Sequence, residues 1–226
     1  MQNEITHPIY APSTMDKADG VAWVAVDKTS PLVMYPFTFM DLTDNEVRLK
    51  TLYTSICHSD LATIREDWGK CNYPCCPGHE IIGEITKIGA KVTNVKVGDI
   101  VGVSPIRYSD NTCDYCLSEA TNLCNDREFL YGTYFGGYSS HMQIDENWVF
   151  HIPQGMDITT MPPLLCAGVT TYAPAKRYQK IGASCAVIGI RGLGHLAVQY
   201  ANKLGKNLIY QRHGSNRFYH KNKELR

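Results

Sequence analysis

The segment PGHEIIGEITKI, residues 77–88, joins a polar Gly-His-Glu turn to an apolar run. The run from Ile81 to Ile88 is rich in β-branched residues and predicts a β-strand. The same segment places His79 and Glu80, two residue types that bind metals, directly before that strand. We therefore expect a strand that belongs to the core of the fold, with potential metal ligands at its start.

Short β-runs separated by Gly, Pro, Asp and Asn surround the segment, from about residue 21 to about residue 149. Further strands are predicted at Val21–Val26, Glu46–Thr54 and Trp148–Ile152. Turns are indicated by Asp44-Asn45 and by the corner at residues 97–99. This pattern predicts a mostly β module that is closed enough to be a barrel.

The composition changes near Met161, where Ala and Leu become frequent. A buried helix is predicted over Met161–Lys176, and Ser184–Ile190 is expected to be a strand buried on both faces of a parallel sheet. Apolar residues then recur at helical spacing from Leu193 to Leu204, with Gly205 at the position of a C-terminal cap. A second strand is predicted at Asn207–Gln211, which completes one crossover unit. The tail beyond it, residues 212–226, is expected to be solvated or disordered.

The composition excludes several classes of protein. The 226 residues contain 22 basic and 22 acidic side chains, so no basic excess supports a nucleic-acid partner. We expect no membrane span, because the longest apolar stretches are far shorter than about 18 residues. The polar N-terminus, Met1–Asp19, does not have the pattern of a secretory signal. The nine cysteines are an odd number, and without such a signal they indicate metal-binding or buried thiols in a cytoplasmic enzyme.

Cys57 and His79 have the side chains that a catalytic zinc requires, and Glu80 could add an oxygen ligand or exchange with water. Spacing alone leaves open that they are unrelated polar residues near loops. Cys166 lies in the run LLCAGVT, residues 164–170, and by itself it would be a buried thiol in an apolar helix.

A second group of potential ligands is compact in sequence. Cys113 and Cys116 form a CxxC turn, a spacing typical of structural zinc sites, and Cys124 follows seven residues after the turn. Three cysteines are one ligand short of a closed site. Asp110 could complete it with an oxygen ligand. The alternative is that the three thiols bind no metal.

The segment GIRGLG, residues 189–194, stands between a predicted strand and a predicted helix, as a dinucleotide-binding loop does. Gly189 and Gly194 hold the outer positions and Arg191 holds the middle one. The candidate cofactor-binding residues of the loop are Gly189, Arg191, Gly192, Leu193 and Gly194.

Together these motifs resemble the zinc-dependent medium-chain alcohol dehydrogenase superfamily, and within it the cinnamyl-alcohol-dehydrogenase-like branch. The resemblance runs from about Val21 to about Tyr210. The matching segments are Cys57–Asp60, Pro77–Glu80, Gly98–Asp99, Gly136–Tyr138, Leu164–Tyr172 and Gly192–His195.

The resemblance implies an α/β protein with two domains. A GroES-like, partly open β-barrel that binds the catalytic zinc would occupy residues 20–160. An incomplete, doubly wound Rossmann-type NADP-binding domain would occupy residues 161–226. Full-length relatives are expected to be homodimers.

The resemblance also assigns roles to single residues. It implies that Cys57, His79 and Cys166 bind the catalytic zinc with Glu80 beside the metal. The remaining assignments are Ser59 as the hydroxyl that relays the alcohol proton, His58 near the cofactor, and Ala62 where the family has a second relay histidine.

The implied reaction interconverts primary alcohols and aldehydes, cinnamyl-type alcohols among them. Zinc would polarise the aldehyde oxygen and the nicotinamide would supply hydride to the carbonyl carbon. NADP is favoured over NAD, because the second strand ends without an acid for the ribose 2′-hydroxyl and Arg212 is nearby.

Three departures from the family pattern lead us to expect impaired activity. Asp110 replaces the first of four cysteines, so the structural zinc site would be weak or empty. Arg191 replaces the glycine that lets the backbone approach the pyrophosphate. Few residues follow Gln211, so we expect a C-terminally truncated member of the family. The alternative is a non-catalytic zinc-binding remnant, which would bind zinc without binding NADPH.

Overall fold

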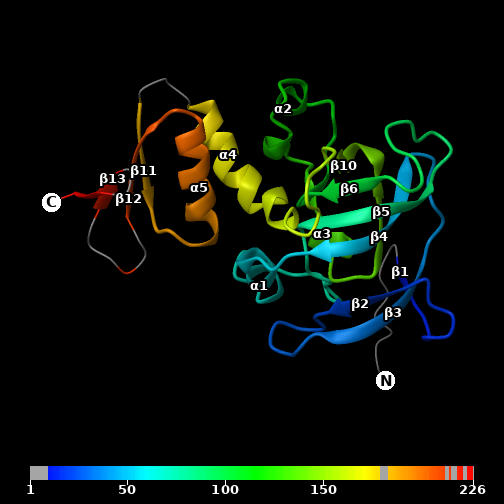
Figure 1. Ribbon diagram of the computed structural model, residues 1–226. Helices are drawn as coiled ribbons and strands as arrows, with labels where there is room; N and C mark the ends of the chain where they lie inside the picture. Colours follow the sequence, from blue (N-terminus) through cyan, green and yellow to red (C-terminus); the bar gives the residue numbers. More distant parts are fainter. Residues whose placement is uncertain (1–9, 179–182, 212–213, 215–217, 221–222, 226) are drawn as a thin grey trace. The chain divides into compact units, whose positions relative to one another are not determined.

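The computed structural model describes residues 10–178, 183–211, 214, 218–220 and 223–225 (Figure 1). Side chains are not described at 132–133, 218–220 and 223–225. The chain divides into two compact units, Met1–Leu165 and Cys166–Arg226. No helix among the described residues is long and apolar enough to cross a membrane.

The first unit is built on antiparallel sheets (Figure 1). The three-stranded sheet has the order β1 (Tyr10–Pro12), β3 (Val33–Phe39), β2 (Gly20–Val24). The five-stranded sheet has the order β10 (Val149–His151), β6 (Ile100–Val103), β5 (Ile81–Ile88), β4 (Glu46–Thr54), β9 (His141–Asp145). A two-stranded sheet pairs β7 (Ile106–Tyr108) with β8 (Glu128–Phe129). The predicted β module is therefore present.

Short helices connect these strands. They are α1 (His58–Ile64), α2 (Asp114–Leu117), α3 (Leu130–Thr133) and the 3-10 turns Thr121–Leu123, Glu146–Trp148 and Pro162–Leu165. The predicted strand at Trp148–Ile152 is shorter than expected, because Trp148 closes a 3-10 turn that is capped by the Asp145 carboxylate.

Alternation along the strands creates the core of the first unit. Val47 and Leu49 of β4 and Ile81 and Ile85 of β5 are fully buried in one apolar cluster. A second, aromatic cluster lies beneath the three-stranded sheet, where the rings of Tyr10 and Phe135 stack with centroids 4.2 Å apart. His79 and Glu80 lie between the two cores in sequence, since Cys76 belongs to the aromatic cluster and Ile81, the first residue of β5, belongs to the other.

The second unit contains α4 (Ala167–Arg177), β11 (Ser184–Ile188), α5 (Gly192–Lys203) and β12 (Asn207–Gln211). Strands β11 and β12 pair in parallel, and α5 connects them and contacts both. The predicted strand, helix and strand are thus present, and Gly205 follows the helix with a φ of 72° as a capping glycine does.

Three predictions for this unit are wrong. The helix expected over Met161–Lys176 is split, because a 3-10 turn ends at Leu165 and α4 begins only at Ala167. Most of α4 is exposed rather than buried. It packs against α5, but only Ala167 and Gly168 at its start are buried. The strand ends at Ile188, which is 75% exposed, so β11 is not buried on both faces.

The tail also differs from the prediction where it is described. Strands β13 (Phe218–His220) and β14 (Lys223–Leu225) pair antiparallel and extend the sheet in the order β11-β12-β13-β14. Backbone hydrogen bonding to the open edge of β12 thus orders a segment whose composition is polar.

Candidate metal and cofactor sites

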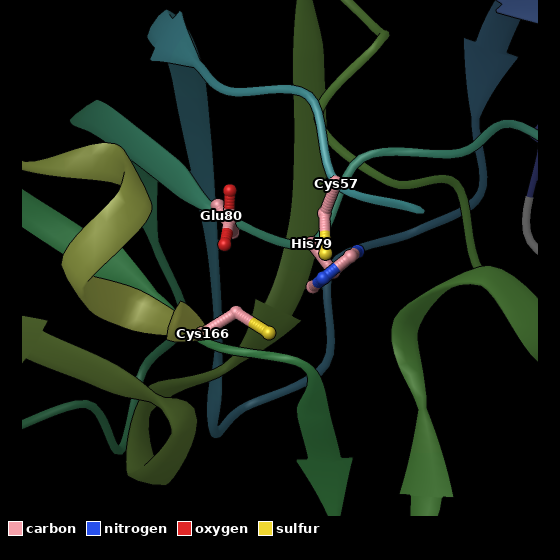
Figure 2. A group of neighbouring side chains, drawn as sticks. All are labelled: Cys57, His79, Glu80 and Cys166. Atoms are coloured by element: carbon pink, nitrogen blue, oxygen red, sulfur yellow. The ribbon is translucent and has the colours of Figure 1, made fainter. Parts of the chain in front are cut away.

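The structure brings together four of the predicted ligands. The ligand atoms of Cys57, His79, Glu80 and Cys166 all lie within 4.8 Å of one another, and Figure 2 shows the two sulfurs and the imidazole converging. We call this group the first cluster. His79 and Glu80 are buried and the two cysteines are half-buried. Cys166 directly follows the last residue of the first unit.

Asp60 orients the histidine of the first cluster. Its Oδ1 lies 2.8 Å from His79 Nδ1 and accepts a hydrogen bond of 2.8 Å from the backbone N–H of Gly78, while its Oδ2 accepts one of 3.1 Å from that of Cys57. Asp60 is only 4% exposed. A carboxylate on one ring nitrogen fixes the ring and directs the other nitrogen to a metal.

Two close backbone contacts hold the ligand-bearing turn. The N–H groups of Gly137 and Tyr138 donate to the carbonyls of Gly78 and Pro77 at 2.8 and 3.0 Å. A Cβ added to Gly136 would lie 2.1 Å from the oxygen of Gly78, so only glycine fits there. The Gly136–Tyr138 motif therefore shapes the turn that presents His79.

Other polar groups surround the first cluster. The Ser55 hydroxyl donates a hydrogen bond to the Glu80 carboxylate, and Ser59 Oγ lies 3.6 Å from Cys57 Sγ. Burial, together with the nearby Asp60 and Glu80 carboxylates, raises the pKa of the Tyr138 hydroxyl to about 12. Tyr138 thus stays protonated and can serve as a hydrogen-bond donor at neutral pH.

The donor set of the first cluster fits zinc. Two thiols, one imidazole and one carboxylate are the side chains that zinc binds, whereas magnesium and calcium prefer oxygen alone. Glu80 is the donor that could exchange with water or substrate oxygen.

An open cavity of about 510 Å³ lies beside Cys57 in the first unit. His58 and Asp60 contribute polar groups to its wall. Most of the remaining lining is apolar, from Pro31, Leu32, Ile56, Leu61, Ile64 and Tyr138. Such a size is within the range of pockets for small organic ligands.

The structure also brings together the second group of ligands. The ligand atoms of Asp110, Cys113, Cys116 and Cys124 lie within 4.8 Å of one another, and we call this group the second cluster. Asp110 Oδ1 accepts hydrogen bonds from the backbone N–H groups of Thr112 and Cys113 at 2.8 and 2.9 Å, and these bonds hold the pKa of its carboxyl below the ordinary value.

The glycine-rich loop has the required backbone. Gly189 has a φ of 87°, and a Cβ on Gly194 would lie 2.0 Å from its carbonyl oxygen. A Cβ on Gly192 would meet nothing within 4 Å, which leaves room for a ligand. Arg191 is the N-cap residue of α5 and is exposed. Leu193 follows in the first turn of α5, and Arg212 lies outside the described residues.

Sequence reasoning missed the roles of two residues. Asp60 was recognised only as part of the Cys57–Asp60 segment, although an acid that follows a cysteine by three residues can cap a helix and support a ligand. No role was predicted for Tyr138 within the Gly136–Tyr138 segment. Neither contact is visible in the sequence, because each joins distant segments.

Comparisons with known proteins agree with this geometry. Residues 43–154 match the family described as the alcohol dehydrogenase GroES-like domain. The probable mannitol dehydrogenase of Fragaria ananassa is 40% identical over 198 residues, which are 84% of this chain and 55% of that protein. Cinnamyl alcohol dehydrogenase 8 of Arabidopsis thaliana is 40% identical over 190 residues, covering 80% of this chain and 53% of the relative.

Two solved structures are also similar. The cinnamyl alcohol dehydrogenase of Helicobacter pylori in complex with NADP(H) has a TM-score of 0.80 at 32% identity, covering 84% of this chain and 58% of that one. A cinnamyl alcohol dehydrogenase from Sorghum bicolor has a TM-score of 0.80 at 34% identity, covering 86% and 58%.

The chain belongs to the zinc-containing medium-chain alcohol dehydrogenase superfamily, in its cinnamyl-alcohol-dehydrogenase-like branch. The predicted fold class is confirmed for this member of the superfamily: a GroES-like, partly open β-barrel is followed by part of a Rossmann-type domain. The chain spans about half the length of the curated relatives that it matches.

Proposed function

We propose that this protein is a zinc-dependent NADP(H) oxidoreductase that interconverts primary alcohols and aldehydes. The observation that carries the proposal is the first cluster, in which two thiols, an imidazole and a carboxylate converge beside an apolar cavity. The similarity to cinnamyl alcohol dehydrogenases supports it.

We assign the parts of the reaction to two domains. Residues 20–160 would bind the substrate and, together with Cys166, the zinc, and residues 161–226 would bind NADP. The NADP(H) complex of the Helicobacter pylori relative supports the choice of cofactor. The open space at Gly192 and the tight Gly189–Gly194 contact suit a loop that holds a pyrophosphate.

Cys57, His79 and Cys166 would hold the catalytic zinc, with Glu80 beside it. Zinc supplies Lewis acidity to the substrate oxygen, and the nicotinamide supplies the hydride. Asp60 keeps the His79 ring aligned through its contact with Nδ1. The second cluster would hold a structural zinc through Cys113, Cys116 and Cys124, with an oxygen from Asp110.

Ser59 would accept the alcohol proton in oxidation and return it in aldehyde reduction, since its hydroxyl lies 3.6 Å from Cys57 Sγ. His58 lines the cavity and would face the cofactor. Ala62 is buried and cannot carry the proton onward, so its further transfer would use water or the cofactor ribose.

The cavity favours an apolar substrate. Ile56 is 89% exposed beside Cys57, and Leu61 and Ile64 line the same wall. An aromatic or aliphatic side chain would bury this surface, whereas a polyol would leave its hydroxyls without partners there. Cinnamyl-type alcohols are therefore our preferred substrate class. Cytoplasmic location, a homodimeric assembly of full-length relatives and impaired activity stay predictions.

The test is NADPH oxidation by the zinc-loaded chain with cinnamaldehyde or with a polyhydroxylated aldehyde such as mannose as the substrate. We expect reduction of cinnamaldehyde that falls about a thousandfold in Cys57→Ser. Zinc binding without NADPH binding, or without cinnamaldehyde reduction, would favour the non-catalytic remnant instead.

A further inference from the structure

Ser55 and Glu80 face each other just beyond the ends of β4 and β5. Thr54 and Ile81 form the end pair of the two strands. Beyond this pair the backbone N–H of Ser55 donates a hydrogen bond of 3.2 Å to the Glu80 carbonyl, and the Ser55 hydroxyl donates to Oε2 of the Glu80 carboxylate. One backbone bond and one side-chain bond therefore fix Ser55 against Glu80.

The Glu80 carboxylate is a buried charge that needs hydrogen-bond donors. Its residue is only 2% exposed, and a carboxylate taken out of water is costly unless hydrogen bonds or a metal replace its hydration. Hydrogen bonds from a hydroxyl to a carboxylate are among the stronger ones in proteins. The Ser55 hydroxyl and a metal at the first cluster would therefore compete for the same carboxylate.

The geometry of the first cluster gives this competition a consequence. Its four ligand atoms lie within 4.8 Å of one another, so a small shift would carry the Glu80 carboxylate onto a zinc held by the other three. In Figure 2 the two sulfurs and the imidazole converge, and the carboxylate lies to one side of them. A catalytic zinc has three protein ligands and one position for water or substrate, which a fourth protein ligand would close.

We propose that Ser55 is a positioning residue, which holds the Glu80 carboxylate off the metal and so keeps the fourth coordination position open for the substrate oxygen. The inference rests on the proposed function, because it concerns the metal of the first cluster. Loss of the hydroxyl would leave the buried carboxylate short of a donor, and the metal is its nearest replacement.

The experiment uses the full chain with cobalt(II) in place of zinc and free imidazole as a probe of the fourth position. Imidazole that binds the metal changes the visible spectrum of cobalt, and the spectrum of Cys57→Ser is subtracted to remove the contribution of the second cluster. We expect Ser55→Ala to bind imidazole about tenfold more weakly than the unmodified chain. Ser55→Thr retains a hydroxyl and should retain the affinity.

A double variant separates this role from a merely structural one. In Ser55→Ala combined with Glu80→Gln no carboxylate remains to close the position, so the affinity for imidazole should recover. Thr159→Val is the matched control, because it removes another hydroxyl that donates to a carboxylate, that of Asp157 at 2.7 Å. It should bind imidazole as the unmodified chain does.

Equal imidazole affinity in Ser55→Ala and the unmodified chain would overturn the proposal, as would a loss that persists in the double variant. If Ser55→Ala does not fold, a crystal structure of the unmodified zinc-loaded chain decides, since a bond from Glu80 to zinc would also overturn the proposal. The cobalt spectra need no turnover. The expected shifts in a chain that does not reduce cinnamaldehyde would refute the proposed function alone, whereas a first cluster that takes up no cobalt would overturn both.

Discussion

The first cluster takes its ligands from residues 57 to 166, whereas the second takes all of its ligands from residues 110–124. In the first cluster His79 and Glu80 are buried. Asp60 contacts the His79 ring, and the close approach of Gly136 to Gly78 holds the turn that carries both residues. In the second only Cys124 is buried, and Asp110 already holds the backbone of its own turn. A site assembled by the whole fold should be rigid and selective. A site assembled by one loop should form locally and exchange its metal more readily.

Removing a thiol from the first cluster should have the largest effect. We expect Cys57→Ser to lower the rate of aldehyde reduction about a thousandfold, because the metal contributes several kcal/mol of transition-state stabilisation. Zinc content should fall by the equivalent of one site, with the second cluster unaffected. Steady-state kinetics and metal analysis measure both, and Cys185→Ser is the control. An unchanged rate would show that the first cluster is not the catalytic centre.

Loss of the Asp60 charge should weaken the same cluster without removing a ligand. Asp60→Asn keeps the shape of the side chain but weakens the hold on His79, and we expect zinc affinity to fall about 10- to 100-fold. Competition with a chromogenic chelator measures the affinity. Asp44→Asn, at an exposed ion pair with Lys91, should change nothing. Equal affinities for the two variants would contradict the support role of Asp60.

The close approach at Gly136 should make the first cluster sensitive to the fold itself. Gly136→Ala places a methyl group against the carbonyl of Gly78, and we expect it to cost about 2 kcal/mol of stability. Gly192→Ala, which meets open space, should leave the unfolding midpoint nearly unchanged. Urea unfolding of both variants measures the difference, and similar midpoints would mean that the turn has room to relax.

Substitution of Asp110 should give the smallest effect, and it should change zinc affinity at the second cluster alone. Asp110→Asn retains an oxygen for the N–H groups of Thr112 and Cys113 but loses the charged ligand, so its zinc affinity should fall on the order of tenfold. Asp110→Cys should instead raise the affinity, because thiolate is the softer ligand. Aldehyde reduction should remain in both. If Asp110→Asn binds zinc as tightly as the unchanged chain, Asp110 only caps the turn.

The sequence predicted the strands at Glu46–Thr54 and Ile81–Ile88 with their observed limits, because alternating β-branched runs are a local property. The second set of ligands was indicated by a compact motif, whereas the first set, spread from residue 57 to residue 166, was implied only by the resemblance to the family. Burial was harder to predict. Helix α4 and strand β11 are apolar in sequence but exposed in large part, because burial depends on which elements pack against them. The role of Asp60 was missed for the same reason, since it is defined by contacts with residues 78 and 79.

The most direct test of the account is a crystal structure of the zinc-loaded chain with anomalous diffraction data collected across the zinc absorption edge. We predict an anomalous peak bonded to the sulfurs of Cys57 and Cys166 and to Nε2 of His79, with the Glu80 carboxylate beside it. A zinc peak confined to the Cys113 loop, with none among these residues, would contradict the assignment of the first cluster as the catalytic metal site.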